Sequence, residues 1–416
     1  MIRRRPWWHS ATAGAVAAVL LAGCTWGGSS RKPSPRAAKP NIVFVLTDDL
    51  AMNLLQYMPH VQAMQLAGST FLHYYVVDSL CCPSRSAIFT GEYPHDDGVF
   101  TNTGEDGGYG AFNKYGNRPR TFAVALKKAG YRTGLMGKYL NGYNPSDPVP
   151  PGWDRWDVAG DGYKEFNYAL NENGKVRKYG KAPQDYLTDV LSRKAVSFID
   201  SSADVGKPFM LEVSTFTPHR PNVAAPRDLH RFPGLKAPRT PAYDALPANA
   251  PAWLQRIPPL TAHDRDDMDR EYRRRAQSVL AIDEMIGRIQ QELSAKGLAK
   301  NTYLVFSSDN GFHMGDHRLR AGKQTAFDTD IRVPLIVTGP GVAAGRAIGQ
   351  MTSSVDLAPT FEAIAGAPIA TRVDGVDLQP LWHGYPPVDW REAVLVEHHG
   401  PDMANSDPDK TPPLNG

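Results

Sequence analysis

The stretch Ile42-Val43-Phe44-Val45-Leu46-Thr47-Asp48-Asp49 begins as an unbroken apolar run and ends in two carboxylates. A continuous run of β-branched and aromatic side chains is typical of a strand buried on both faces of a parallel sheet. In open α/β sheets, ligands bind beyond the carboxyl ends of the strands. The stretch therefore predicts an α/β fold, with Asp48 and Asp49 placed to hold a cation at that edge of the sheet. The alternative is that the two acids cap a following helix.

A second strand with a similar ending lies far along the chain. Residues 302–307 form another largely apolar run, which Asp309 and Asn310 follow closely. If both strands belong to one sheet, three carboxylates and one carboxamide meet at the same edge. Such an oxygen-rich set favours a hard cation, calcium rather than zinc, because neither histidine nor thiolate needs to join it. We therefore expect Asp48, Asp49, Asp309 and Asn310 to bind calcium.

The segment Cys81-Cys82-Pro83-Ser84-Arg85-Ser86-Ala87-Ile88-Phe89-Thr90-Gly91 has the features of a reactive group at a helix start. Pro83 suits the first turn of a helix, so Cys81 should lie at its N-terminus, where unpaired N–H groups favour an anion. Arg85 adds a fork of donors suited to sulfate or phosphate oxygens. The alternatives are two buried core cysteines or a strained Cys81–Cys82 disulfide.

This segment resembles the Cys-x-Pro-Ser-Arg signature of the type I sulfatases, which belong to the alkaline phosphatase-like superfamily. The resemblance implies an α/β sandwich with a large, mixed, mostly parallel central sheet flanked by helices. In that family a separate formylglycine-generating enzyme oxidises the first cysteine, here Cys81, and the hydrated aldehyde is the nucleophile. Residue 81 also completes the coordination of one calcium ion, whose other family ligands align with Asp48, Asp49, Asp309 and Asn310.

The resemblance implies further site residues. Lys138, after a predicted strand over residues 131–136, matches a family lysine that contacts sulfate, and Lys323 aligns with a second one. His219 follows a predicted strand over residues 208–214 and matches a histidine that can protonate the leaving alcohol. Many sulfatases carry another histidine where this chain has Leu140. The run Gly-Lys-Tyr-Leu-Asn is nevertheless similar to the N-acetylglucosamine-6-sulfatase branch.

Two long segments lack clear periodicity. Residues 141–184 contain Pro, Gly, Trp153 and Trp156, and predict a cleft rim or surface excursion with a hairpin around Asn173-Gly174. Residues 224–259 are proline-rich, and we expect them to shape the pocket for the leaving group because long loops in compact domains are usually functional.

Residues 1–24 are typical of a targeting segment, with three early arginines, an apolar run and a Leu-Ala-Gly-Cys ending at Cys24. This ending resembles the bacterial lipoprotein cleavage box, which implies an exported, cell-surface protein anchored to the membrane by acylated Cys24. The alternative is a plain secretory signal, and Arg4-Arg5 is a feature of twin-arginine export signals. Residues 25–40 predict a flexible tether.

The remaining chain predicts one catalytic domain over residues 41–396, followed by a polar, Pro-rich tail over 397–416 or the start of a truncated C-terminal subdomain. With 416 residues and a net charge of +3, the chain can bury a large core and shows no basic stripe for nucleic acid. Its three cysteines offer no disulfide framework.

We therefore expect a sulfatase that acts on a sulfated sugar or aryl alcohol. One rival is a phosphonate monoester or phosphodiester hydrolase of the same superfamily. Another is a lipoprotein that binds sulfated glycans without turnover.

Overall fold

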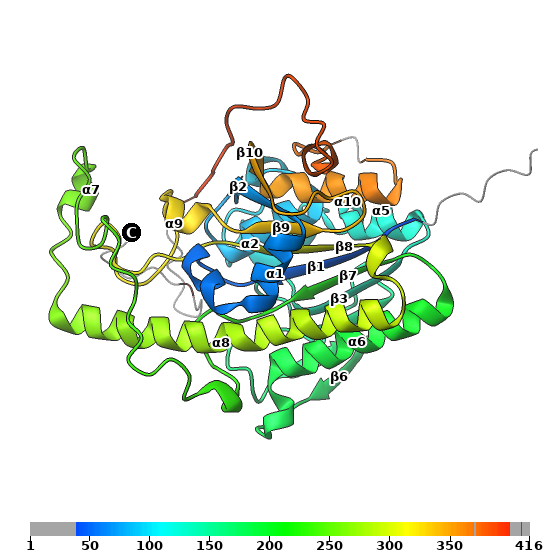
Figure 1. The fold of residues 1–416 in the computed structure, drawn as a ribbon, viewed down its shortest axis with the longest axis horizontal. Coiled ribbons are helices and arrows are strands. Elements are labelled where there is room, and N and C mark those ends of the chain that lie inside the picture. The colour runs from blue at the N-terminus through cyan, green and yellow to red at the C-terminus, as the bar shows by residue number, and fades with distance from the viewer. Residues whose placement is uncertain (1–38, 370–371, 400–408, 410–416) are drawn as a thin grey trace, which may run out of the picture. The chain divides into compact units, whose positions relative to one another are not determined.

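The computed structural model describes residues 39–369, 372–399 and 409 (Figure 1). The predicted signal segment with Cys24, and nearly all of the predicted tether, lie outside these residues. Among the helices that the structure describes, none combines the length and the apolar character needed to cross a membrane.

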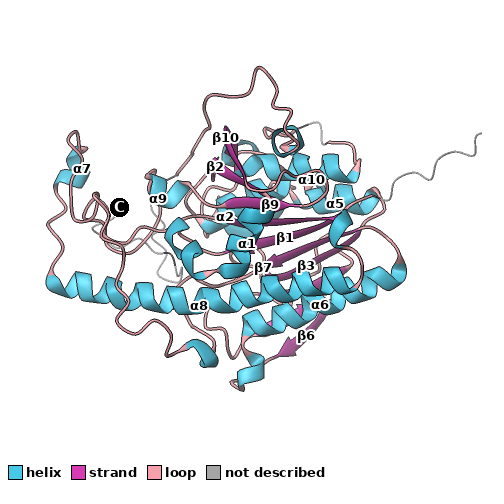
Figure 2. Ribbon diagram, viewed as in Figure 1, coloured by secondary structure: helices cyan, strands magenta, loops and turns pink. Residues whose placement is uncertain are grey.

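One sheet organises the described chain, with the strand order β10-β2-β9-β8-β1-β7-β3-β4-β5-β6 (Figure 2). Its strands are β1 Asn41–Thr47, β2 Ser69–Tyr75, β3 Arg132–Lys138, β4 Arg155–Ala159, β5 Ala169–Glu172, β6 Lys175–Lys178, β7 Phe209–Ser214, β8 Thr302–Ser308, β9 Leu335–Thr338 and β10 Arg346–Ser353.

The centre of the sheet is parallel. Strand β1 pairs in parallel with both β7 and β8, and β7 continues through β3 to β4 in the same sense. Antiparallel pairs join β9 to β2 and β8, and β5 to β4 and β6. The predicted mixed, mostly parallel sheet is thus confirmed. Because β1, β3, β7 and β8 run in the same direction, their carboxyl ends meet at one edge.

Helices cover both faces of this sheet (Figure 1). Along β1, Ile42, Phe44 and Leu46 join the core on the side of α5 and α10. Val43 and Val45 join the opposite core with α6 and α8. The helices are α1 Pro59–Ala67, α2 Cys81–Thr90, α3 Pro94–Asp97, α4 Gly108–Lys114, α5 Phe122–Lys128, α6 Leu187–Val205, α7 Ala252–Gln255, α8 Ala262–Ala295, α9 Asp328–Ile331, α10 Leu357–Ala365 and α11 Gln379–Trp382.

The segment 141–184 corrects one expectation. It contributes β4, β5 and β6 to the main sheet, and Trp156 on β4 is fully buried, with its Nε1 donating to Tyr143 Oη at 2.8 Å. The surface interpretation was therefore wrong for β4, because polar residues beside Trp156 obscure a short strand. The predicted hairpin is confirmed, since Asn173 and Gly174 both have the positive φ that its turn requires.

Candidate active site

Helix α2 places Cys81 at the edge where the parallel strands end. Leu80 before it is extended, Cys81 is the first helical residue, and every residue of the helix is buried. Gly91 ends the helix with φ 74°, in the left-handed region that other residues rarely adopt. The Cys82 N–H donates to Asn102 Oδ1 at 2.9 Å, which satisfies one unpaired donor of the first turn.

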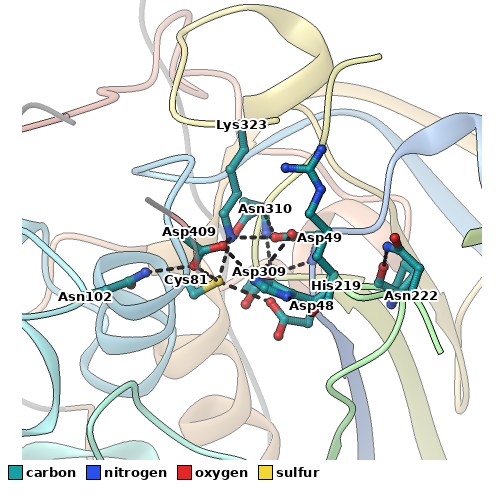
Figure 3. A network of polar contacts seen from close by, with 12 residues as sticks. Asp48, Asp49, Cys81, Asn102, His219, Asn222, Asp309, Asn310, Lys323 and Asp409 are labelled. Atoms are coloured by element: carbon teal, nitrogen blue, oxygen red, sulfur yellow. Dashed lines mark hydrogen bonds and ion pairs between the residues drawn. The ribbon is translucent and has the colours of Figure 1, made fainter. Parts of the chain in front are cut away.

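The acidic residues come from two neighbouring strands. Thr47 at the end of β1 pairs with Ser308 at the end of β8, so the acids that follow these strands lie together. The Asp49 N–H donates to Asp309 Oδ1 at 3.2 Å, and Asn310 Nδ2 donates to Asp49 Oδ1 at 2.7 Å (Figure 3). Asp49 has a φ of 64°, a strained conformation that turns two consecutive carboxylates toward one site.

Three cations, Arg85, Lys138 and Lys323, surround these acids. Arg85 Nε donates to Asp309 Oδ2 at 2.7 Å, while its Nη1 donates to Ser214 Oγ at 2.6 Å. Lys138 Nζ lies 2.6 Å from Asp48 Oδ2. All of these side chains are almost completely buried. The pairing compensates charges that would be very costly to bury alone.

Lys323 enters from the loop between β8 and α9. Its Nζ lies 2.6 Å from Asp49 Oδ1 and donates to Cys81 Sγ at 2.8 Å (Figure 3). Burial alone would lower the pKa of Lys323, but the neighbouring Asp409 and Asp49 raise it well above its ordinary value. Lys323 is therefore a fixed cation directly beside the side chain of residue 81.

His219 lies beside the other carboxylate oxygen of Asp49. Its Nδ1 is 2.6 Å from the carbonyl of Arg220, and its Nε2 is 2.6 Å from Asp409 Oδ1 and 3.7 Å from Asp49 Oδ2. Because both ring nitrogens face acceptors, the doubly protonated ring fits this position best. Burial opposes that charge, but the carboxylates, led by Asp49 and Asp409, raise the pKa of His219 to about 8.

The Cys81 thiol itself is not activated. Burial, followed by the carboxylates of Asp409 and Asp48, raises its pKa well above the ordinary value. A thiolate is the nucleophilic form of cysteine, so Cys81 as a thiol would react poorly at neutral pH.

The acidic end of the site fits a hard cation. Asp48, Asp49, Cys81 and His219 offer ligand atoms within 4.8 Å of one another. Asn310 Oδ1 is buried and has no hydrogen-bond partner, which suits a cation ligand. Because carboxylate and amide oxygens are typical calcium ligands, the donor set suits calcium.

All nine residues expected at the site therefore lie in one buried cluster, hereafter the site cluster: Asp48, Asp49, Cys81, Arg85, Lys138, His219, Asp309, Asn310 and Lys323.

Sequence reasoning missed three residues in or beside this cluster. The carboxylate of Asp409 contacts His219, and the side-chain amide of Asn102 in turn donates to Asp409 (Figure 3). Tyr163, from the segment expected to form a rim, lies with its ring 5.1 Å from Lys138 Nζ and 4.5 Å from the ring of His219. Neither Asn102 nor Asp409 directly follows a strand of the sheet, so no strand-end signal marks them.

Comparisons with known proteins agree with this geometry. The sulfatase family model matches residues 40–367. The chain is 36% identical over 383 residues to human N-acetylglucosamine-6-sulfatase, which covers 89% of this chain and 69% of that protein. It is 35% identical over 377 residues to the extracellular sulfatase SULF-1 homolog of Drosophila melanogaster, covering 88% of this chain but 34% of that longer protein.

Solved structures share the fold. BT4656, in complex with its substrate D-glucosamine-2-N,6-O-disulfate, superposes with a TM-score of 0.72 at 24% identity, covering 87% of this chain and 84% of that one. The phosphonate monoester hydrolase of Agrobacterium radiobacter superposes with a TM-score of 0.67 at 21% identity, covering 88% and 81%. Taken together with the site cluster, the family match leads to one conclusion: the chain belongs to the sulfatase family, whose members are sulfuric ester hydrolases.

Proposed function

We propose that the protein hydrolyses the sulfate ester of a sugar, using a formylglycine made from Cys81 and one calcium ion. The observation that carries the proposal is the burial of Cys81 between Lys323 Nζ, at 2.8 Å, and Asp48 Oδ1, at 3.2 Å, inside the site cluster. Residue 81 thus adjoins both a fixed cation and the acids of the metal site.

The inactive thiol supports modification of Cys81. A hydrated formylglycine would supply one hydroxyl to attack sulfur and a second whose ionisation later expels sulfate, so no water need attack the enzyme-bound group. The buried, protonated thiol offers neither function.

The cations have distinct tasks in this proposal. Lys138 and Lys323, held by Asp48 and Asp49, face a sulfuryl group bound at residue 81 with fixed positive charge. Arg85 is anchored by Asp309, and its Nη2 is buried without a hydrogen-bond partner, so it keeps a free donor in the site cluster. Preorganised charge of this kind is usually the largest contribution to catalysis.

His219 is the proposed proton donor. A sugar alkoxide is a poor leaving group, so its departure requires protonation of the bridging oxygen. His219 Nε2 points into the site cluster, 3.7 Å from Asp49 Oδ2, and carries a proton at neutral pH because its pKa is raised to about 8. The contact with the Arg220 carbonyl fixes the ring so that Nε2 faces the site.

Asp48, Asp49, Asp309 and Asn310 are the proposed calcium ligands. The unpartnered Asn310 Oδ1 and the strained backbone of Asp49 support this set. A bound calcium ion would add a further positive charge against a sulfate oxygen.

The sugar specificity rests on relatives. The human and goat relatives are both named N-acetylglucosamine-6-sulfatase and are each 36% identical to this chain. A sulfated amino sugar is therefore the proposed substrate class.

Turnover of matched substrates tests the proposal. The full chain, co-expressed with a formylglycine-generating enzyme, should hydrolyse 4-nitrophenyl sulfate and N-acetylglucosamine 6-sulfate, whereas Cys81→Ala should not. Cys82→Ala is the matched control, because Cys82 is equally buried but contacts Asn102 rather than the site acids. A dominant rate with bis(4-nitrophenyl) phosphate or a phosphonate monoester would favour the rival hydrolase.

Export and lipid anchoring complete the proposal. Relatives named extracellular sulfatases support export. Membrane fractionation should find the full chain with the membrane and a Cys24→Ser variant in the soluble fraction. Equal release of both proteins would favour a plain secretory signal.

A further inference from the structure

A carboxylate already lies inside the site cluster, that of Asp409 (Figure 3). Its side chain carries two oxygens and a negative charge, so it stands in for two oxygens of a bound sulfate. Its polar contacts include Oδ1 to His219 Nε2 (2.6 Å) and Lys323 Nζ (2.9 Å), Oδ2 to Asn102 Nδ2 (2.8 Å) and Cys81 Sγ (3.4 Å), and its main-chain carbonyl to Gln324 Nε2 (2.6 Å).

The two carboxylate oxygens of Asp409 contact different residues of the site. Oδ1 is held by His219 and Lys323, both of which belong to the site cluster. Oδ2 lies 3.4 Å from Cys81 Sγ, and a residue outside that cluster, Asn102, donates to it. The oxygen beside the reacting atom is therefore recognised by an amide that sequence reasoning did not find.

The orientation of Asn102 is fixed by the helix of the nucleophile. Its Oδ1 accepts the Cys82 N–H at 2.9 Å, and its side chain is completely buried. A backbone N–H can only donate, so the amide oxygen must face it and the NH₂ group must face the anion. The donor is thus held in place before any substrate binds.

We propose that Asn102 binds the substrate's sulfate oxygen that lies next to the attacking atom of residue 81. This rests on the proposed sulfatase function and adds a substrate-binding residue to it. Where many sulfatases carry a further histidine, this chain has Leu140, which is buried, aliphatic and unable to donate a hydrogen bond to sulfate. Asn102 supplies a neutral donor on the side of the anion facing away from Lys323 and His219.

A purely structural role for Asn102, capping helix α2, makes a different prediction. Asn102→Asp keeps the oxygen that accepts the Cys82 N–H, so the cap and the fold should survive. It removes the NH₂ donor and places a like charge against sulfate. Asn102→Ala removes both the cap and the donor.

The test compares these variants in the full chain carrying formylglycine. The measurements are kcat/KM for 4-nitrophenyl sulfate, the melting temperature, and the rise in melting temperature with inorganic sulfate. Asn301→Asp is the control, because Asn301 lies beside the start of β8, at the other end of that strand from Asp309.

Hydrogen bonds to charged groups suggest a loss of roughly 10- to 100-fold in kcat/KM for Asn102→Asp, measured on protein that still shows a cooperative melting transition without sulfate. Stabilisation by sulfate should also be lost in this variant and kept in Asn301→Asp. Wild-type kcat/KM and sulfate stabilisation in Asn102→Asp would overturn the inference.

The same experiment distinguishes failure of the proposed function from failure of the inference about Asn102. An aldehyde-bearing wild-type protein without sulfatase turnover would overturn the proposed function. Sulfate stabilisation would still report whether Asn102 binds the anion.

Discussion

Arg85 Nε donates to Asp309 Oδ2 at 2.7 Å, and both side chains are fully buried although 224 residues separate them in the chain. The contact joins the helix that starts at residue 81 to the end of β8. This buried ion pair therefore helps to hold the helix that bears residue 81 against the acidic edge of the sheet.

Removing Arg85 should destabilise the fold as well as the site. Arg85→Ala leaves Asp309 buried without its partner, which typically costs about 3–5 kcal/mol of unfolding free energy. Arg85→Lys keeps the charge but cannot reach Asp309 and Ser214 through one planar fork. Its unfolding free energy should therefore lie between those of the wild type and Arg85→Ala. Urea-induced unfolding measures both, and wild-type stability in Arg85→Ala would contradict the assignment.

Calcium should bind through oxygen ligands. At about 100 times its dissociation constant it should stabilise the protein by about 2.7 kcal/mol, and a chelator should reverse this. Calorimetric titration should show binding lost in Asp49→Ala and Asp309→Ala but kept in His219→Ala, although His219 lies in the same group of potential ligands. The opposite pattern would show that the ligand set is wrong.

The proposed role of His219 as proton donor predicts a dependence on the leaving group. His219→Ala should lower kcat for N-acetylglucosamine 6-sulfate by roughly 10²- to 10⁴-fold, the usual contribution of a general acid. The loss should be much smaller for 4-nitrophenyl sulfate, whose phenolate leaves without a proton. Equal losses for the two substrates would mean that His219 serves mainly to bind sulfate.

The Asp409 carboxylate lies where we propose that sulfate binds, so it should compete with substrate. Asp409→Asn removes its charge beside Lys323 and His219, so KM for 4-nitrophenyl sulfate should fall while kcat stays unchanged. Asp389→Asn, at an exposed position, is the control. A higher KM in Asp409→Asn would instead make Asp409 a substrate-binding residue.

Glu212 predicts a pH dependence of stability. It is fully buried on β7, neither carboxylate oxygen has a hydrogen-bond partner, and burial raises its pKa from 4.5 to about 8 against the opposing effect of Arg85. The folded protein therefore binds this proton more tightly than the unfolded chain. Stability should fall as pH rises between these two values, by up to about 1.4 kcal/mol per pH unit. Glu212→Gln should remove this contribution to the slope in unfolding experiments, and an unchanged slope would argue against a buried neutral Glu212.

The sequence predicts much of the site because strand ends converge. Asp48 and Asp309 follow apolar strands that pair in register, so local pattern and sheet geometry suffice to bring them together. Lys323 lies in a loop, and only the family resemblance indicated it. Asn102 and Asp409 reach the site through tertiary contacts that no local pattern encodes.

The strand β4 shows the corresponding limit for the fold. Trp156 is flanked by Arg155 and Asp157, so the segment lacks the apolar run that marks β1. Asp157 is buried because Arg155 and Lys194 pair with it, at 2.5 Å and 3.0 Å. One of these partners, Lys194, comes from helix α6, which is distant in sequence, so the burial of this polar strand depends on a tertiary contact.

Mass spectrometry of the peptide containing residues 81 and 82 tests the central claim most directly. For protein made with the formylglycine-generating enzyme, we expect an aldehyde at residue 81 and an alkylatable thiol at Cys82. Two alkylatable thiols, or a reducible bond between them, in a preparation that hydrolyses sulfate esters would contradict the account.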